Sequence, residues 1–161
     1  MDKNVLYDPA VKSETKDPAL SLACFRRIVE EMHTTVVATV DNEGLPVTCV
    51  IDMMDYDAEG LYFLTNFGKS FYGRLKERGY LSLSATDGKP TMECTAVTVA
   101  GRVREEGPEV LARLMEKNPY MYELYPTEER RATLRAFKIV DGTGNLYELG
   151  EKPPRQTYFV F

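Results

Sequence analysis

The sequence predicts a mainly β protein of the α+β class, an antiparallel barrel of six or more strands with flanking helices. Short runs of alternating or β-branched apolar residues, such as TTVVATV and YLSLSA, recur along the chain. Turn-rich segments separate these runs at short, regular intervals, with little helix between them. This order of elements is typical of a small meandering barrel.

The chain has 161 residues, of which 43% are hydrophobic and 28% charged, close to the average for a globular protein. This length predicts a single domain over residues 1–161. Residues 1–17 form a polar lead, and residues 150–161 form an extended C-terminal tail that contains two consecutive prolines.

The charge balance is acidic, because 20 Lys and Arg against 25 Asp and Glu give a formal charge of −5. Nucleic acids and anionic membranes bind clustered Lys and Arg, so neither is an expected partner. The apolar stretches are shorter than the roughly 18 residues of a membrane span, and the first residues are polar. We therefore expect a cytoplasmic protein.

Cysteine and histidine are scarce. Cys24, Cys49 and Cys94 are widely spaced and odd in number, which indicates reduced thiols and neither disulfides nor a zinc site. His33 is the single histidine, so no multi-histidine metal site is expected and hydrolysis by a histidine-based triad is disfavoured.

An amphipathic helix is predicted over residues 18–33. Asp17 is a typical N-cap, Pro18 favours the first helical position, and apolar residues then recur at helical spacing. The runs TTVVATV and LPVTCVIDMM follow, separated by a turn at residues 41–44, and predict a β-hairpin. A second turn leads to a third strand, LYFLTN.

Gly68, Lys69 and Ser70 follow that strand and open a short helix that ends at Gly79. A helix N-terminus, an ammonium group and a hydroxyl together suit a phosphate dianion. The segment is not a P-loop, because Phe63 stands where that motif has its first glycine. The alternative is that Lys69 and Ser70 only cap a surface helix.

The rest of the chain adds strands around two helical stretches. After YLSLSA, a long strand is expected through TMECTAVTVAGRVREE, with a bulge or tight bend at Gly101. Pro108 starts a helix that Asn118 ends, and residues 120–134 form a further short helical stretch. Two strands, AFKIVD and NLYEL, are predicted around a turn at residues 142–144, followed by an aromatic strand in the tail.

Over residues 20–105 the chain resembles the pyridoxamine-5′-phosphate oxidase-like, flavin-binding split barrels. The resemblance is carried by the segments VATVDNEGLPVTCVIDM, GLYFLTNFGKSFYGRL, YLSLSA and VTVAGRVRE, and by the spacing from Cys49 to Thr65. It implies a split barrel in which FMN lies along the second strand, with its phosphate where the third strand meets the following helix.

Carried over by position, the resemblance implies a set of residues that bind FMN: Cys49, Val50, Ile51, Leu64, Thr65, Lys69, Ser70 and Phe71. The chain departs from the vitamin enzyme of that family at three points. That enzyme has basic residues on the second strand, where this chain has Cys49 and Met54. Ser70 and Phe71 stand where that enzyme has a basic pair, and no arginine is followed two positions later by histidine near the C-terminus. The chain is therefore identified as a divergent member and not as the vitamin B6 enzyme itself.

Few side chains suggest acid–base chemistry. Asp52 and Glu93 are candidates, but their positions on half-polar strands account for them equally well. His33 falls where a helix ends, so its default role is to interact with the helix dipole. Cys49 behaves by default as a small apolar residue. Packing likewise accounts for the cluster of Tyr120, Tyr122 and Tyr125.

The leading hypothesis is an FMN-binding oxidoreductase that transfers electrons from a reduced nicotinamide or similar donor to a small acceptor. Flavin carries this chemistry itself, which fits the scarcity of catalytic side chains. The alternative is a module without turnover that holds flavin or another planar cofactor as a sensor, store or chaperone. Uncovered strand edges and the aromatic end at residues 158–161 predict a homodimer, and the resemblance implies flavin at its interface.

Overall fold

The computed structural model describes residues 16–161, so the predicted polar lead lies almost wholly outside the described residues. Residues 16–161 form one antiparallel sheet of seven strands: β1 (Thr34–Val40), β2 (Pro46–Asp57), β3 (Gly60–Asn66), β4 (Tyr80–Thr86), β5 (Thr95–Glu105), β6 (Leu134–Glu148) and β7 (Arg155–Val160). The strand order is β3-β2-β1-β4-β5-β6-β7, and β3 also pairs with β6. This pairing closes the first six strands into a barrel with β7 outside it.

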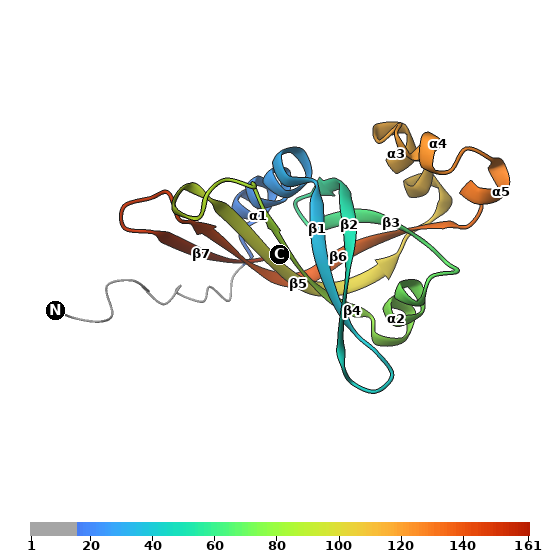
Figure 1. Cartoon of the computed structure of the whole chain (residues 1–161), viewed down its shortest axis with the longest axis horizontal. Helices are drawn as coiled ribbons and strands as arrows, with labels where there is room; N and C mark the ends of the chain where they lie inside the picture. The colour runs from blue at the N-terminus through green and yellow to red at the C-terminus, as the bar shows by residue number, and fades with distance from the viewer. Residues whose placement is uncertain (1–15) are drawn as a thin grey trace.

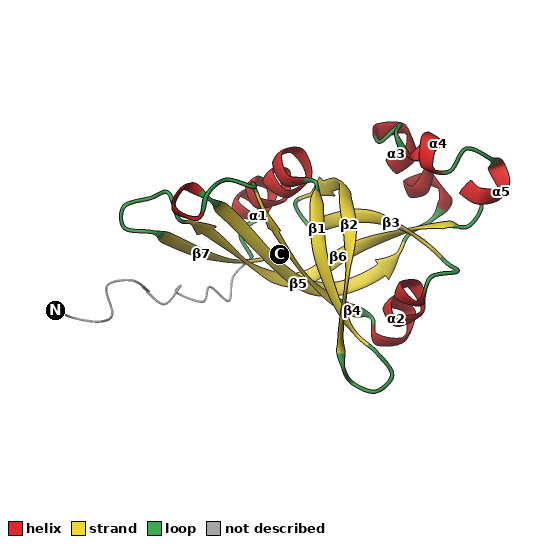
Figure 2. Ribbon diagram, in the orientation of Figure 1, coloured by secondary structure: helices red, strands yellow, loops and turns green. Residues whose placement is uncertain are grey.

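Helices flank the barrel: α1 (Pro18–Arg26) with the π-helix η1 (Arg27–Met32), α2 (Ser70–Arg78), the 3₁₀ turn η2 (Thr91–Glu93), α3 (Pro108–Lys117), α4 (Met121–Leu124) and α5 (Glu128–Arg131). Figure 1 shows α3, α4 and α5 gathered at one end of the molecule and β7 at the other. The strands dominate the fold (Figure 2), so the predicted mainly β class with flanking helices is confirmed.

Two strands exchange partners along their length, and this splits the barrel. β2 pairs with β1 over residues 46–52 and with β3 over residues 53–57. β6 pairs with β3 over residues 134–139 and with β7 over residues 143–148. On its other edge β6 pairs with β5 over residues 137–148. The strands diverge where each exchange occurs.

The barrel interior is filled by aromatic and aliphatic side chains. Buried and exposed positions alternate along β1 and β4, as the period-two pattern predicts. Phe63 stacks on Phe137 at 5.7 Å between ring centroids. A second apolar cluster, which includes Leu64, Leu114 and Met121, lies between β3 and the helices α3 and α4. Each face of β3 is thus covered by a core of its own.

Local sequence signals act as predicted at three positions. The carboxylate of Asp17 accepts a hydrogen bond from the Leu20 N–H at 3.0 Å and caps α1. Gly79 ends α2 with φ 66°, a left-handed conformation that favours glycine. At Gly101 the register of β5 against β6 shifts, which confirms the predicted bulge. The predicted start of that strand at Thr91 is wrong, because residues 91–93 form the turn η2 and β5 begins at Thr95.

The predicted turn at residues 142–144 is wrong, because β6 runs unbroken from Leu134 to Glu148. Gly142 and Gly144 instead allow neighbouring elements to pack closely against β6. A Cβ on Gly142 would collide with the Ala100 carbonyl, and one on Gly144 would collide with the Phe159 ring. The glycines therefore admit the aromatic tail and the neighbouring strand.

The aromatic end of the chain is buried within the protein itself. Phe159 and Phe161 are almost fully buried, and their rings lie 5.9 and 4.9 Å from the Phe25 ring of α1. The expectation that these rings need a second subunit to cover them is therefore wrong. A dimer interface would have to lie on another surface of the protein.

Candidate functional site

An open strand edge beside a helix N-terminus forms the candidate site. Over residues 46–52, β2 pairs with β1 alone, and its other edge has no strand partner within residues 16–161. β3 diverges from this edge and leads through residues 67–69 into α2. Figure 1 shows α2 beside the β1–β2 hairpin and β3. Backbone amides along the β2 edge are thus available to a ligand.

Thr65 supplies a buried polar atom without a partner. This residue lies on β3 near the divergence from β2 and is 3% exposed. Its Oγ1 has no hydrogen-bond partner within residues 16–161. A buried hydroxyl in this state costs free energy, so its retention indicates a group that the ligand-free protein does not supply. An orphaned hydroxyl beside an open strand edge fits a polar cofactor.

Positive charge collects at the start of α2. Lys69 is the N-cap of the helix, and no side chain caps the first amide groups, which leaves their N–H donors available. Within residues 16–161, neither Lys69 nor Arg74 forms an ion pair with a carboxylate. Arg74 donates from Nε to Thr39 Oγ1 at 2.7 Å and from a terminal nitrogen to Ser70 Oγ at 3.1 Å. These charges are compatible with a phosphate group.

The three predicted residues of β2 do not share one face. Cys49 and Ile51 pack against the barrel core, whereas the side chain of Val50 lies on the outer face and is 64% exposed. Burial raises the pKa of the Cys49 thiol, and the positive charges of Arg74 and Lys69 only partly oppose this rise. Cys49 therefore lies within the electrostatic reach of both cations.

The residues predicted at the junction fall into two groups. Lys69 and Ser70 are exposed at the helix start, while Leu64 and Phe71 are buried in different clusters on opposite sides of β3. Leu64 and Phe71 can meet a ligand only through their backbone atoms. Lys69 and Ser70 thus lie together at the start of α2, the charges of Lys69 and Arg74 act on the Cys49 thiol, and Thr65 lies on β3 before this junction.

Arg74 is the cation that sequence reasoning missed. It stands four residues after Ser70, one helical turn further along the same face of α2. That spacing was the available signal, but an arginine in a surface helix has no distinctive local pattern. Its contact with Thr39 on β1 depends on the packing of α2 against the barrel.

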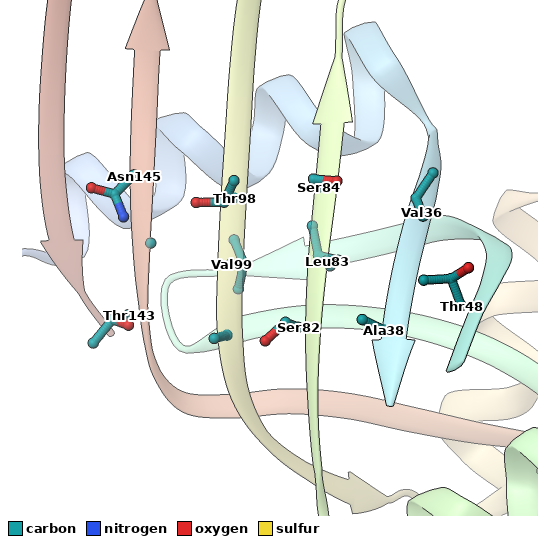
Figure 3. A pocket seen from close by; sticks show the side chains of 12 residues that line it. Val36, Ala38, Thr48, Ser82, Leu83, Ser84, Thr98, Val99, Thr143 and Asn145 are labelled. Atoms are coloured by element: carbon teal, nitrogen blue, oxygen red, sulfur yellow. The ribbon is translucent and has the colours of Figure 1, made fainter. Parts of the chain in front are cut away.

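The outer face of the barrel carries an uncharged groove of about 360 Å³. Five strands contribute its lining, and Figure 3 shows these side chains across neighbouring strands: Val36, Ala38, Thr48, Ser82, Leu83, Ser84, Thr98, Val99, Ala100, Thr143, Gly144 and Asn145. Lys, Arg, Asp and Glu are absent from this lining. Val36 and Val50 on this face are 48% and 64% exposed. A broad uncharged face of this kind is typical of a contact surface.

Two further kinds of feature are missing from the described part of the chain, a metal-ligand cluster and a membrane-spanning helix. Residues 16–161 contain no group of three or more His, Cys, Asp or Glu side chains that could hold a metal ion. Within the same range, every helix is too short or too polar to cross a membrane.

Comparison with solved structures gives three informative neighbours. A NimC/NimA family protein from Clostridium acetobutylicum has a TM-score of 0.72 at 15% identity, covering 89% of this chain and 96% of that one. HutZ, a heme storage protein from Vibrio cholerae, has a TM-score of 0.57 at 16% identity, covering 84% and 90%. A pyridoxamine 5'-phosphate oxidase-related, FMN binding protein from Nostoc punctiforme has a TM-score of 0.56 at 10% identity, covering 89% and 94%.

These identities are low, so the three structures show a shared fold and no more. A comparison with curated protein sequences finds no match. The sequence pattern of the pyridoxamine 5'-phosphate oxidase family matches residues 23–140, from α1 through most of the barrel. This range contains the β1–β2 hairpin, the β3–α2 junction and both cations at the start of α2. The chain therefore belongs to the pyridoxamine 5'-phosphate oxidase family, as a divergent member.

Proposed function

We propose that this protein binds FMN at the open β2 edge and uses it to transfer electrons from a reduced nicotinamide or similar donor to a small acceptor. Lys69, Arg74 and the N-terminus of α2 would hold the phosphate. Backbone atoms of residues 49–51 would lie beside the ring, and the Thr65 hydroxyl would bond to the cofactor. FMN, when bound, supplies the hydride and electron transfer.

The observation that carries this proposal is the orphaned Thr65 hydroxyl. It is 3% exposed and lacks a partner within residues 16–161, although almost all buried polar atoms in proteins have one. The site also offers donors suited to an anion and a free strand edge suited to the polar atoms of a planar ring. A phosphorylated planar cofactor would satisfy all three features at once.

The protein's own side chains contribute binding and exclusion of water. Ile51 and Cys49 contribute partly buried apolar side chains from β2, while Lys69 lies at the start of α2 and Arg74 one turn after Ser70. This division suits a cofactor with an apolar ring at one end and a dianion at the other. The three free cysteines agree with a reducing compartment, so we place the protein in the cytoplasm.

Titration of the purified protein with FMN tests the binding step. We expect tight binding that quenches flavin fluorescence, and anaerobic NADH or NADPH should then bleach the bound flavin. A Thr65→Val variant has nearly the same shape but lacks the hydroxyl. It should bind FMN about tenfold more weakly, as loss of one hydrogen bond predicts. Unchanged affinity in Thr65→Val would remove this residue from the site.

Heme is the second candidate ligand, because the neighbour from Vibrio cholerae is a heme storage protein of the same fold. Lys69, Arg74 and the uncapped N–H groups at the start of α2 suit a phosphate, which FMN has and heme lacks, so they favour FMN. Titration with hemin under the same conditions separates the two. Tight hemin binding without FMN binding would favour the alternative of a cofactor-holding module without turnover.

We further propose that the protein is a homodimer that associates through the uncharged groove on the outer face. Valine, alanine, threonine and serine side chains from five strands form this surface, and burying them costs no charge desolvation. The flavin-binding edge of β2 belongs to the same strand as Thr48 and Val50 on this face. A second subunit would therefore lie close to the bound cofactor.

Light scattering with a charged substitution tests the dimer. Val50→Asp puts a carboxylate on the proposed interface and should give a monomer mass. Leu22→Asp, at an exposed position of α1 away from this face, should leave a dimer. A monomeric wild type that retains FMN would contradict the proposal.

A further inference from the structure

A hydrogen-bonded cluster of His33, Asp52 and Tyr120 lies where the barrel meets the segment between α3 and α4. The Tyr120 hydroxyl donates to Oδ2 of Asp52 at 2.9 Å, and Nε2 of His33 lies 3.2 Å from the same hydroxyl. Thr34 donates to the other carboxylate oxygen at 2.8 Å. Segments far apart in the sequence thus converge on one carboxylate.

The cluster determines which nitrogen of His33 carries hydrogen. The single hydroxyl hydrogen of Tyr120 is donated to Asp52, so Nε2 of His33 has to be the donor in its contact with that oxygen. Neutral imidazole has one donor and one acceptor nitrogen. Nδ1 is therefore the acceptor, and it has no partner within residues 16–161. A carboxylate that fixes a tautomer in this way is a common device in proton transfer.

The backbone at His33 is held in an unusual conformation. It has φ 60° and ψ −61°, a combination that non-glycine residues rarely adopt. Its N–H donates to the Ile28 carbonyl at 2.6 Å, and its carbonyl accepts from the Met53 N–H at 2.9 Å. The residue also ends the π-helix η1. Strained residues and π-helices both concentrate at functional sites.

His33 lines a surface groove of about 480 Å³ between η1, β2 and the end of α3. The charged groups facing this groove are compensated. Asp55 pairs with Lys117 at 2.7 Å and with Arg113 at 3.1 Å. Glu30 pairs with Arg26 and accepts from the hydroxyl of Tyr56. Each carboxylate and ammonium group of the lining thus already has a partner of opposite charge, so the groove suits an uncharged polar molecule.

We propose that Nδ1 of His33 is a proton-transfer site in this groove for a small uncharged molecule that carries a weakly acidic O–H or N–H group. The ligand's O–H or N–H bond breaks, a bond from that hydrogen to Nδ1 forms, and the ligand becomes an anion. The imidazolium carries the positive charge, which is opposed by the Asp52 carboxylate, whose Oδ2 lies 3.6 Å from Nε2 of His33. The reverse step returns the proton.

Tyr120 and Asp52 act in this scheme as positioning residues. Burial, the hydrogen bond to Asp52 and that residue's negative charge together raise the pKa of Tyr120. The hydroxyl therefore keeps its proton at neutral pH and remains a donor to Asp52. The inference does not depend on FMN binding, and its measurements are made without added flavin.

Nitrogen NMR of the full protein reads the tautomer directly, because His33 is the single histidine. In the wild type at mildly alkaline pH we expect the form protonated at Nε2. Tyr120→Phe removes the nearer acceptor of that hydrogen and leaves only Oδ2 of Asp52 at 3.6 Å, beyond hydrogen-bond distance, so it should give a mixture of tautomers. Tyr122→Phe, a nearby control, should leave the spectrum unchanged. A wild type protonated at Nδ1, or a Tyr120→Phe variant with unchanged tautomer, would overturn the assignment.

Carbethoxylation by diethyl pyrocarbonate tests whether Nδ1 is open to the groove. We expect rapid modification of the wild type at Nδ1. Glu30→Trp covers the groove and should slow the reaction about tenfold, as expected when a pocket wall shields a small ligand. Glu31→Trp, on the same helix but outside the groove, is the matched control. An unreactive imidazole would assign the cluster a purely structural role and overturn the proposal.

Phenol tests the chemical class of the ligand. As an uncharged weak acid it should shift the Nδ1 resonance of His33, while anisole, which has a similar shape but lacks the acidic hydrogen, should not. Equal effects of the two compounds, or none from either, would refute a site for weak acids.

Discussion

Two lysines on this barrel carry their charge in opposite settings. Lys138 on β6 is 2% exposed, and its Nζ lies 2.8 Å from Asp57 and 4.9 Å from the centre of the Tyr62 ring. Lys69, at the start of α2, is exposed and forms no ion pair within residues 16–161. The protein itself neutralises the first charge, because a buried ammonium without partners would be too costly. It leaves the second available.

The difference shows that a cation's partners decide its role. A lysine paired within the protein stabilises the fold, whereas an unpaired lysine is available to bind a ligand. Burial alone would raise the pKa of Asp57, but hydrogen bonds from Lys138, Tyr62 and the Glu59 N–H lower it below its ordinary value. Burial alone would lower the pKa of Lys138, but its bonds to Asp57 and Tyr62 raise it. Each partner thus stabilises the charged form of the other.

The largest effect is expected from Asp57→Ala, which leaves the Lys138 ammonium buried without its main partner. The free energy of unfolding should fall by about 1 to 3 kcal/mol, less than for a fully buried pair, because the Asp57 side chain is 44% exposed. Urea denaturation measures this change. Glu59→Ala is the control, because that carboxylate lies 3.5 Å from Lys138 with an 84% exposed side chain. It should cost at most about 0.5 kcal/mol.

The same pair predicts a dependence on pH. Because the folded-state pKa of Asp57 is lowered, its stabilising contribution is present above about pH 4, the ordinary carboxyl value, and is lost as the pH falls through the folded pKa. The free energy of unfolding of Asp57→Ala should therefore fall less steeply than that of the wild type as the pH is lowered below about 4. Parallel acid curves for the two proteins would contradict the role given to this carboxylate.

A smaller effect is expected at the unpaired cation. Lys69→Ala should weaken FMN binding about ten- to hundredfold, the cost of one charge-assisted bond to phosphate, with little change in stability. Calorimetry compares it with Lys76→Ala, also in α2, whose ammonium is already 2.7 Å from the Glu105 carboxylate at the end of β5. Equal losses in both variants would indicate general electrostatics in place of a phosphate site.

Two buried threonines extend the comparison to uncharged groups. The Thr35 hydroxyl donates to the Ile51 carbonyl at 2.8 Å, whereas that of Thr65 has no partner within residues 16–161. Thr35→Val should destabilise the protein by about 1 kcal/mol, and Thr65→Val should leave the ligand-free protein as stable or stabilise it slightly. Thermal unfolding without FMN gives both values. A similar destabilisation in the two variants would mean that Thr65 is satisfied in solution.

The smallest effect concerns Cys49, the one free cysteine of the three that is not fully buried. Because the charge of Lys69 lowers the Cys49 pKa against the effect of burial, Lys69→Ala should raise that pKa further. Alkylation by iodoacetamide at pH 8 should then slow by about two- to threefold, since the thiolate is the reactive form. Bound FMN should protect the thiol in the wild type. If Cys49 is alkylated at the same rate with and without FMN, this residue does not belong to the cofactor site.

Local sequence patterns predicted most of the elements that position the site. The β1–β2 hairpin, the N-cap at Asp17, the helix end at Gly79 and the Gly-Lys-Ser start of α2 depend on residues close together in the chain. The physical forces that select them act over a few residues. These patterns also carried the family resemblance, which the match over residues 23–140 confirms.

The sequence by itself thus determined the strand-and-helix order, the mainly β class and the presence of a cationic helix start after β3. Only the tertiary structure decided which groups remain unpaired. The orphaned Thr65 hydroxyl, the freedom of Lys69 and the meeting of His33 with Tyr120 all depend on contacts between strands and helices distant in sequence. Closure of the barrel fixes those contacts, because hydrogen bonds and ion pairs form only between groups that packing brings within a few ångströms.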